Sequence, residues 1–186
     1  MKNIGVNGFG RIGRYFTRLS LTKDDISVKV VNDLGDINTL MHLLKYDSVH
    51  GKLNLSFKIT GNKVTFENGK EILFLNEPNP ENVHWNQYNV ETVIEATGLF
   101  LTKEKAYKHI TGGAKKVILS APAKDSEIKT VVLGVNEEIL EENFEIISNA
   151  SCTTNSAAPL IKVISELYNI ENAFISTVHS YTWTTL

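Results

Sequence analysis

The sequence predicts an α/β fold with a doubly wound, mostly parallel sheet, and three observations carry this prediction. Short apolar segments alternate with segments of helical periodicity along most of the 186 residues, which is the pattern of βαβ units. A glycine-rich turn follows the first apolar segment, and an acidic residue follows the second. One region, residues 53–75, instead alternates apolar and polar positions, which is typical of antiparallel strands.

The expected elements follow one another as short strands and longer helices. The first strand, Ile4–Asn7, runs into the glycine-rich turn, from which a helix near Arg11–Leu21 is expected to start. A second strand, Val28–Asn32, and a second helix, Ile37–Lys45, continue the same alternation. Further strands are expected near Thr92–Ala96, Val117–Ser120, Thr130–Leu133, Glu145–Ser148 and Phe174–His179, with helices near Lys103–Ile110 and Thr153–Tyr168.

The exception to this alternation lies between Leu53 and Leu75. Apolar residues occupy every second position from Leu53 to Ile59, which is the period of a half-buried strand. The dipeptides Gly61-Asn62 and Asn68-Gly69 are turn signals between the apolar runs. We therefore expect an antiparallel meander inserted into the parallel sheet.

The glycine-rich turn has the G-x-G-x-x-G spacing in the strand–turn–helix context that a dinucleotide site requires. Gly8 would form the tight turn, Gly10 would let the backbone approach a pyrophosphate, and Gly13 would let the helix pack close to the strand. Asp33 lies about 20 residues farther on, where a ribose-binding carboxylate is expected in such a site. The alternative is a turn or capping role for Asp33 before the helix that begins near Ile37. The spacing favours a Rossmann-type fold, and a carboxylate at Asp33 would repel a 2′-phosphate and so favour NAD over NADP.

A second candidate site surrounds Cys152, the only cysteine of the chain. It lies between an expected strand and an expected helix, so the backbone N–H groups and dipole of the helix N-terminus would favour a thiolate. A thiolate is the nucleophile that covalent catalysis requires. The alternative is a small buried hydrophobic residue, but the flanking serine, threonine and asparagine residues are polar.

His179 is the candidate partner of this thiol. It ends the expected strand Phe174–His179, one helix after Cys152, and a returning strand could bring its imidazole to the thiol. The imidazole could then stabilise the thiolate and move protons, whereas the alternative is a structural histidine at a strand end. The other histidines have no metal-ligand spacing and are assigned to helix faces and loops, so no metal is expected; they are His42, His50, His84 and His109.

Composition narrows the function classes. A formal net charge of −2 argues against nucleic acid as the main partner. A single cysteine excludes an internal disulfide and fits a reducing, cytoplasmic compartment. The N-terminal residues do not read as a signal peptide, and no apolar run approaches the roughly 20 residues of a membrane span.

Several blocks of the sequence closely resemble phosphorylating glyceraldehyde-3-phosphate dehydrogenases. They are NGFGRIGR, HLLKYDSVHG, EATGLF, KKVILSAP, SNASCTTN and HSYT, in the order found in that family. The resemblance implies an NAD-binding Rossmann domain over residues 1–151, followed by the start of a catalytic domain over residues 152–186. It also implies a homotetramer for the full-length family.

The resemblance implies NAD-dependent oxidation of glyceraldehyde 3-phosphate to 1,3-bisphosphoglycerate. Cys152 would attack the aldehyde to form a thiohemiacetal, and His179 would accept the hydroxyl proton as hydride passes to NAD. Inorganic phosphate would then attack the resulting thioester. Ser151 and Thr153 match positions that hold this phosphate, and Thr182 matches one that holds the substrate's own phosphate. The positions matching the cofactor site are Gly8, Gly10, Arg11, Ile12, Gly13, Asn32, Asp33, Thr97, Gly98 and Ser120.

The sequence departs from the family where it stops, shortly after HSYT. We therefore expect a truncated α+β catalytic domain, incomplete for turnover by itself, and an exposed apolar face on the helix after Cys152 that favours self-association. Two other functions stay open. One is erythrose-4-phosphate dehydrogenase, which shares nearly all these motifs, and the other is a non-catalytic remnant that binds a nucleotide or a partner.

Overall fold

The computed structural model describes residues 1–141 and 143–179, and its main feature is a nine-stranded sheet in the order β10-β11-β9-β8-β1-β2-β7-β6-β5. Every neighbouring pair from β10 to β7 is parallel, and the pairs β7–β6 and β6–β5 are antiparallel. This confirms the predicted α/β fold. The strands are β1 (Lys2–Asn7), β2 (Ile26–Asn32), β5 (Phe57–Thr60), β6 (Lys63–Phe66), β7 (Glu71–Leu75), β8 (Thr92–Glu95), β9 (Lys116–Leu119), β10 (Lys129–Thr130) and β11 (Ile146–Ser148).

The parallel part of the sheet has the strand order of a doubly wound dinucleotide-binding fold. From one side it reads β7, β2, β1, β8, β9 and β11, which corresponds to the order 3-2-1-4-5-6. The direction of winding reverses between β1 and β8, and ligands of such sheets bind beside the carboxyl ends of the strands at this point. Strand β10 lies outside β11, at the edge of the sheet. It covers Lys129–Thr130, so it begins one residue before the predicted strand Thr130–Leu133 and is shorter than that prediction.

The predicted meander is present, with two differences. Its first strand begins at Phe57 and not at the predicted Leu53. Leu53 is buried in the core but belongs to no strand. Its last strand, β7, pairs antiparallel with β6 and also parallel with β2, with Val31 opposite Phe74. The meander is therefore continuous with the parallel sheet. A separate two-stranded hairpin, β3 (Tyr46–Asp47) and β4 (Gly51–Lys52), precedes it.

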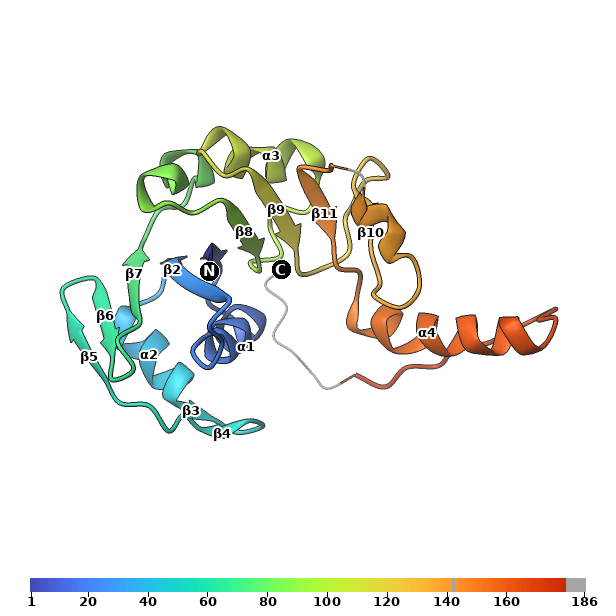
Figure 1. Ribbon diagram of the computed structural model, residues 1–186, viewed down its shortest axis with the longest axis horizontal. Helices are drawn as coiled ribbons and strands as arrows, with labels where there is room; N and C mark the ends of the chain where they lie inside the picture. Colours follow the sequence, from blue (N-terminus) through green and yellow to red (C-terminus); the bar gives the residue numbers. More distant parts are fainter. Residues whose placement is uncertain (142, 180–186) are drawn as a thin grey trace.

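Helices cover both faces of the sheet (Figure 1). On one face, α2 (Ile37–Lys45) contributes Met41 and Leu44 to the apolar cluster that contains Val6 and Val31. Helix α1 (Arg11–Ser20) lies on the same side. On the other face, α3 (Lys103–Thr111) packs over β9, and the fully buried Trp85 joins a neighbouring cluster. In the part of the chain that the structure describes, three short 3₁₀ helices complete the connections: Pro80–Asn82, Trp85–Tyr88 and Glu137–Glu141.

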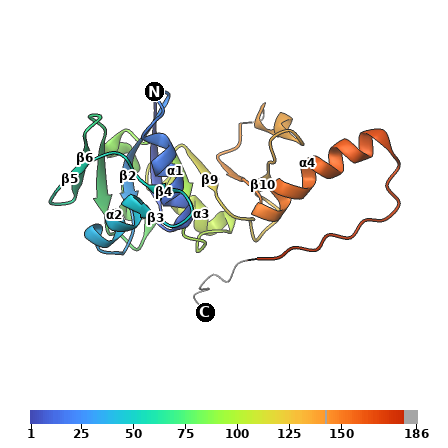
Figure 2. The ribbon, with the colours of Figure 1, turned by 90° about the horizontal axis from the view of Figure 1, so that it is seen from below.

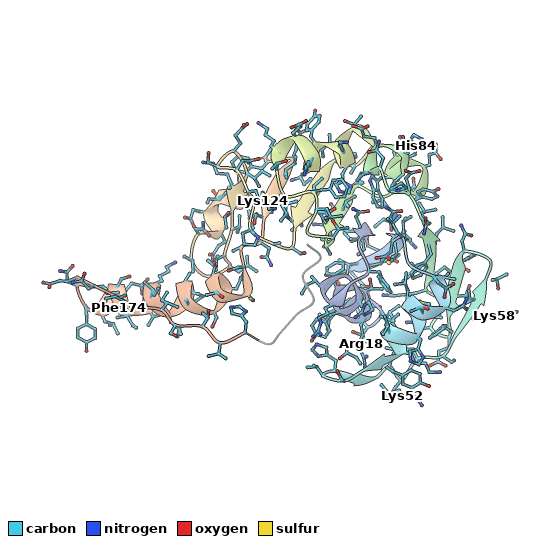
Figure 3. The ribbon with its side chains drawn as sticks, turned by 180° about the vertical axis from the view of Figure 1, so that it is seen from behind. Arg18, Lys52, Lys58, His84, Lys124 and Phe174 are labelled. Carbon is cyan, nitrogen blue, oxygen red and sulfur yellow. The ribbon has the colours of Figure 1, made fainter. Side chains whose placement is uncertain are left out.

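The last described helix, α4 (Cys152–Leu167), follows β11 and extends away from the sheet (Figures 1 and 2). Several apolar side chains on it are exposed, as the sequence predicted. They are Leu160, Ile161, Val163, Ile164 and Leu167. The side chain of Phe174, on the segment after α4, is fully exposed at the far end of the molecule (Figure 3).

The expected strand Phe174–His179 is wrong. Residues 172–179 are described and carry no strand assignment. A strand requires a neighbour that satisfies its N–H and C=O groups, whereas this segment lies beside α4, with Phe174 and Ile175 lining the same groove as Leu160.

Within the described ranges, no helix is long and apolar enough to cross a membrane.

Helix α1 closely approaches the glycine-rich turn that follows β1, and this approach generates a prediction. A Cβ atom on Gly13 would lie 2.0 Å from the carbonyl oxygen of Gly8, whereas a Cβ on Gly10 would meet no atom within 4 Å. Replacing Gly13 with alanine should lower the free energy of unfolding by about 1–3 kcal/mol, the usual cost of overpacking. The matched variant Gly10→Ala should lose clearly less. Urea denaturation followed by circular dichroism measures both, and equal losses would contradict the assigned contact.

Candidate functional site

A cavity of about 340 Å³ lies at the carboxyl ends of β1, β2, β7 and β8. This is where the winding of the sheet reverses, and so where a dinucleotide is expected in this fold. Most of the lining residues follow these strands directly. They are Asn7, Gly8, Gly10, Asn32, Asp33, Leu34, Glu77, Pro78, Ala96, Thr97, Leu99 and Phe100.

The glycine-rich turn is fixed to the rest of the sheet by hydrogen bonds and by one buried ring. The Gly8 N–H donates to the carbonyl of Asn32 at 2.8 Å, and the guanidinium of Arg14 donates to the carbonyl of Phe9 at 2.9 Å. Burial lowers the pKa of Arg14, although an arginine remains charged at neutral pH. The Phe9 ring is fully buried and meets Phe74 edge-on, with ring centroids 5.3 Å apart. The turn is thus held in place before any ligand binds.

Gly8 has a conformation and surroundings that exclude a side chain. Its φ is +92°, and a Cβ there would lie 2.7 Å from the backbone nitrogen of Thr97. Gly8 therefore makes the tight turn that its spacing predicted, and it brings the end of β1 against the residues that follow β8.

The N-terminus of α1 differs from those of the other described α-helices. Asp36, Thr102 and Ser151 each accept a hydrogen bond from a backbone N–H at the start of α2, α3 and α4. Gly10, the residue before α1, offers no side chain for this purpose. The first N–H groups of α1 are consequently available to an anionic ligand, and Gly10 leaves their approach open.

Asp33 both shapes the turn and lines the cavity. Its Oδ2 accepts a hydrogen bond from the Phe9 N–H at 2.6 Å, and its Oδ1 accepts one from the Gly35 N–H at 2.8 Å. The residue that caps α2 is Asp36, whose pKa is lowered chiefly by the hydrogen bond from the Thr39 N–H. The capping alternative for Asp33 is therefore wrong, while a turn role coexists with a place in the cavity wall.

The remaining predicted cofactor residues surround the cavity to different degrees. Thr97 lines it, and Gly98, with a φ of +76°, lies between the lining residues Thr97 and Leu99. Arg11 and Ile12 are exposed on the first turn of α1. Ser120 follows β9 and is not among the lining residues, although its N–H donates to the carbonyl of Glu95 at 3.0 Å.

Sequence reasoning missed a cluster of buried polar side chains at this cavity: Asn7, which lines it, and Glu95 and His109, which lie behind it. Asn7 and Glu95 are the last residues of β1 and β8, and the side chain of His109 is fully buried on α3. A polar residue at the end of an apolar strand was a visible signal, but its partner could not be identified from the sequence. His109, one of the four histidines assigned to helix faces and loops, lies on α3, and its side chain is on the buried face of this helix.

Cys152 lies at a strand-to-helix junction, as predicted. It is the first residue of α4 and is exposed, so the alternative of a buried hydrophobic cysteine is wrong. Ser151 caps the helix by accepting a hydrogen bond from the Thr154 N–H at 2.9 Å. The preceding residue, Ala150, has a φ of +59°, a conformation that costs an ordinary residue about 1–2 kcal/mol. The chain thus makes a strained turn immediately before the thiol.

His179 reaches this junction without the predicted strand. Its Nε2 lies 3.5 Å from the Oγ1 of Thr153, the residue after Cys152. No hydrogen bond joins His179 directly to the Cys152 thiol in the described residues. Thr182, the third residue predicted to hold phosphate, lies outside the described residues. Over the ranges that the structure covers, no group of three His, Cys, Asp or Glu side chains is placed to hold a metal ion.

Comparison with known proteins decides the family. The model of the glyceraldehyde 3-phosphate dehydrogenase NAD-binding domain matches residues 2–103, and that of the C-terminal domain of the same family matches residues 151–185. The chain belongs to the glyceraldehyde-3-phosphate dehydrogenase family. The resemblance noted in the sequence is confirmed, and the cavity lies within the segment that matches the family's NAD-binding domain.

Three relatives show the extent of the similarity. Glyceraldehyde-3-phosphate dehydrogenase of Geobacillus stearothermophilus is 52% identical over 96% of this chain and 53% of its own length. Glyceraldehyde-3-phosphate dehydrogenase 1 of Bacillus cereus is 49% identical over 98% of this chain and 54% of its own. The Thermotoga maritima enzyme is 49% identical over 98% of this chain and 55% of its own. The chain therefore spans about half the length of the curated relatives it matches.

The exposed thiol at the start of α4 allows a direct chemical test. Because the N-terminus of a helix favours the thiolate, iodoacetamide at neutral pH should alkylate Cys152 several times faster in the folded chain than in the chain unfolded with urea. The sequence contains a single cysteine, so the increase in intact mass reports this residue alone. A small-molecule thiol measured in the same two solutions controls for the effect of urea. Equal corrected rates would show that the fold does not activate the thiol.

Proposed function

We propose that this chain provides the NAD site and the nucleophile of a phosphorylating aldehyde dehydrogenase. The observation that carries this proposal is that a cavity at the switch point of the sheet and an exposed thiol at a helix N-terminus both follow strands of one parallel sheet. The proposed substrate is glyceraldehyde 3-phosphate, and the proposed product is 1,3-bisphosphoglycerate. Residues 1–151 would form the NAD-binding domain and residues 152–186 the start of the catalytic domain.

The residues around the cavity fit NAD. The uncapped N-terminus of α1 would bind the pyrophosphate through the N–H groups of Arg11 and Ile12, and Gly10 leaves room for it. The carboxylate of Asp33 would accept hydrogen bonds from the adenosine ribose. When bound, NAD supplies a hydride acceptor, and the role of these residues is to hold and orient it.

The chemistry of the aldehyde would take place at Cys152. The thiolate would add to the carbonyl carbon, and the oxyanion formed would take a proton from His179. The imidazole would take this proton back as hydride leaves the same carbon for the bound dinucleotide. The resulting thioester is cleaved by inorganic phosphate, which releases the thiolate and the acyl phosphate. Ser151 and Thr153 would hold this phosphate at the first turn of α4, and Thr182 would hold the substrate's phosphate. The contact between Thr153 and His179 supports this assignment because it brings the base beside the nucleophile.

The ribose assignment of Asp33 gives a prediction about cofactor choice. Replacing Asp33 with alanine should weaken NAD binding about tenfold to a hundredfold, because a hydrogen bond to a charged group contributes roughly 1.5–3 kcal/mol. NADP binding should not fall in proportion, because the same change removes the charge that repels a 2′-phosphate. Isothermal titration calorimetry with both nucleotides measures the difference.

Asp36→Ala is the matched control for this prediction. Asp36 is a nearby carboxylate that caps α2 and does not line the cavity, so its removal should leave both affinities unchanged. An equal loss for NAD and NADP in Asp33→Ala would mean that Asp33 only holds the turn through Phe9 and Gly35.

Because the chain by itself is expected to be incomplete for turnover, the aldehyde chemistry is tested in a form of it extended with the remaining C-terminal segment of a curated relative. NADH formation is measured in the presence of phosphate and each of two aldehydes, glyceraldehyde 3-phosphate and erythrose 4-phosphate. The proposal expects the glyceraldehyde 3-phosphate reaction to be the faster, and Cys152→Ser to abolish it because a serine hydroxyl is a far weaker nucleophile at neutral pH. A faster reaction with erythrose 4-phosphate would change the substrate assignment. NADH formation that survives in Cys152→Ser would refute the covalent mechanism.

A further inference from the structure

Behind the cavity lies a buried carboxylate that no step of the proposed reaction uses. The side chains of Glu95, at the end of β8, and His109, on α3, are both fully inaccessible to solvent, and Glu95 Oε2 lies 2.9 Å from His109 Nε2. A buried carboxylate is costly unless hydrogen bonds compensate for its lost hydration. The partners of Glu95 therefore show what it contributes.

Four donors surround Glu95. Oε1 accepts hydrogen bonds from the Thr97 N–H at 2.7 Å and from the Thr97 hydroxyl. Oε2 accepts from Asn7 Nδ2 at 2.7 Å and lies within hydrogen-bond distance of His109 Nε2. An ionised carboxylate has about four acceptor sites, and these four contacts match that number.

His109 fits the role of a hydrogen-bond donor in this arrangement. Its Nδ1 is buried without a hydrogen-bond partner among the described residues, and its ring lies near Trp85 and Phe100, with centroid distances of 5.8 Å to each. An imidazole that carries a proton on Nε2 can donate to Glu95. His109 therefore completes the shell of Glu95 from α3.

The network reaches the walls of the cavity. Asn7 Oδ1 accepts from Asn32 Nδ2 at 2.7 Å, and Asn32 exchanges two hydrogen bonds of 2.8 Å with the backbone of Glu77. Asn7, Asn32, Glu77 and Thr97 all line the cavity, and they follow or end four different strands, β1, β2, β7 and β8. One buried carboxylate thus connects four segments of the cavity wall.

We propose that Glu95 and His109 are positioning residues of the dinucleotide pocket. Neither lines the cavity. Glu95 holds Thr97 and Asn7 directly, and it holds Asn32, the neighbour of Asp33, through Asn7. His109 keeps the carboxylate in place, so the positions of Thr97 and Asn7 in the cavity wall depend on the position of α3. This inference rests on the NAD site proposed above and adds two residues that set its shape.

The test compares three variants of the chain by calorimetric titration with NAD, well below the midpoint of thermal unfolding. His109→Leu removes the donor to Glu95 and should raise the Kd about tenfold, the order expected when one hydrogen bond to a charged group is lost. His109→Gln restores an N–H donor and should recover most of the affinity. Val117→Ala, which trims a buried side chain in a core cluster outside this network, should destabilise the fold and leave the Kd unchanged.

Hydrogen exchange provides a readout that does not depend on NAD. The amides of Thr97 and Glu77 donate to Glu95 and Asn32, so both should exchange faster in His109→Leu while amides in the centre of β1 stay protected. If His109→Leu does not fold, Glu95→Gln replaces it in both measurements, because the amide keeps the shape of the side chain and removes one acceptor oxygen.

The outcomes separate this inference from the proposed function. A Kd in His109→Leu equal to that of the unsubstituted chain, or an equal loss in Val117→Ala, would overturn the positioning role and leave the NAD site intact. If the unsubstituted chain binds no NAD, the proposed NAD site is refuted. Hydrogen exchange at Thr97 and Glu77 then still tests whether His109 and Glu95 position the cavity wall. Unchanged exchange at both amides would then overturn the positioning role.

Discussion

The approach of α1 to β1 is the constraint on which the cofactor side of this molecule depends. A side chain at Gly13 would collide with the carbonyl of Gly8, and a side chain at Gly8 would collide with Thr97. Two positions without side chains therefore bring a strand end, a helix N-terminus and the residues after β8 to one place. Because Gly10 also leaves the helix without a side-chain cap, the resulting N–H groups face a crevice that an anionic ligand can enter.

Several apolar strands end at one edge of the sheet in buried polar residues, which need hydrogen-bond partners. A network among these residues provides the partners. Asn7, Asn32 and Glu95 are the buried last residues of β1, β2 and β8, and each must find hydrogen-bond partners away from water. They satisfy one another, with His109 contributed by α3. The same bonds that make burial tolerable fix the relative positions of the strand ends, so stability and the shape of the pocket are coupled.

The thiol segment is built in a more local way. The cap from Ser151 and two hydrogen bonds from the Asn155 amide to the carbonyls of Asn149 and Ser151 involve residues within six positions of one another. These bonds fix the start of α4 and the exposed position of Cys152. The apolar side chains farther along α4 stay exposed, and the chain spans about half the length of its curated relatives.

The sequence by itself determined the elements that depend on near neighbours. The glycine turn, the helix starts, the meander turns and the junction at Cys152 all follow from backbone geometry and periodicity over a few residues, and the structure contains each of them. Tertiary structure alone decided the pairing of β7 with β2, the absence of a strand at Phe174–His179 and the partners of Glu95. The reason is separation along the chain: Asn7 and Glu95 are 88 positions apart, and a hydrogen bond over that distance depends on how the whole sheet is wound. A strand likewise forms only where a neighbour accepts its backbone, which no local pattern can guarantee.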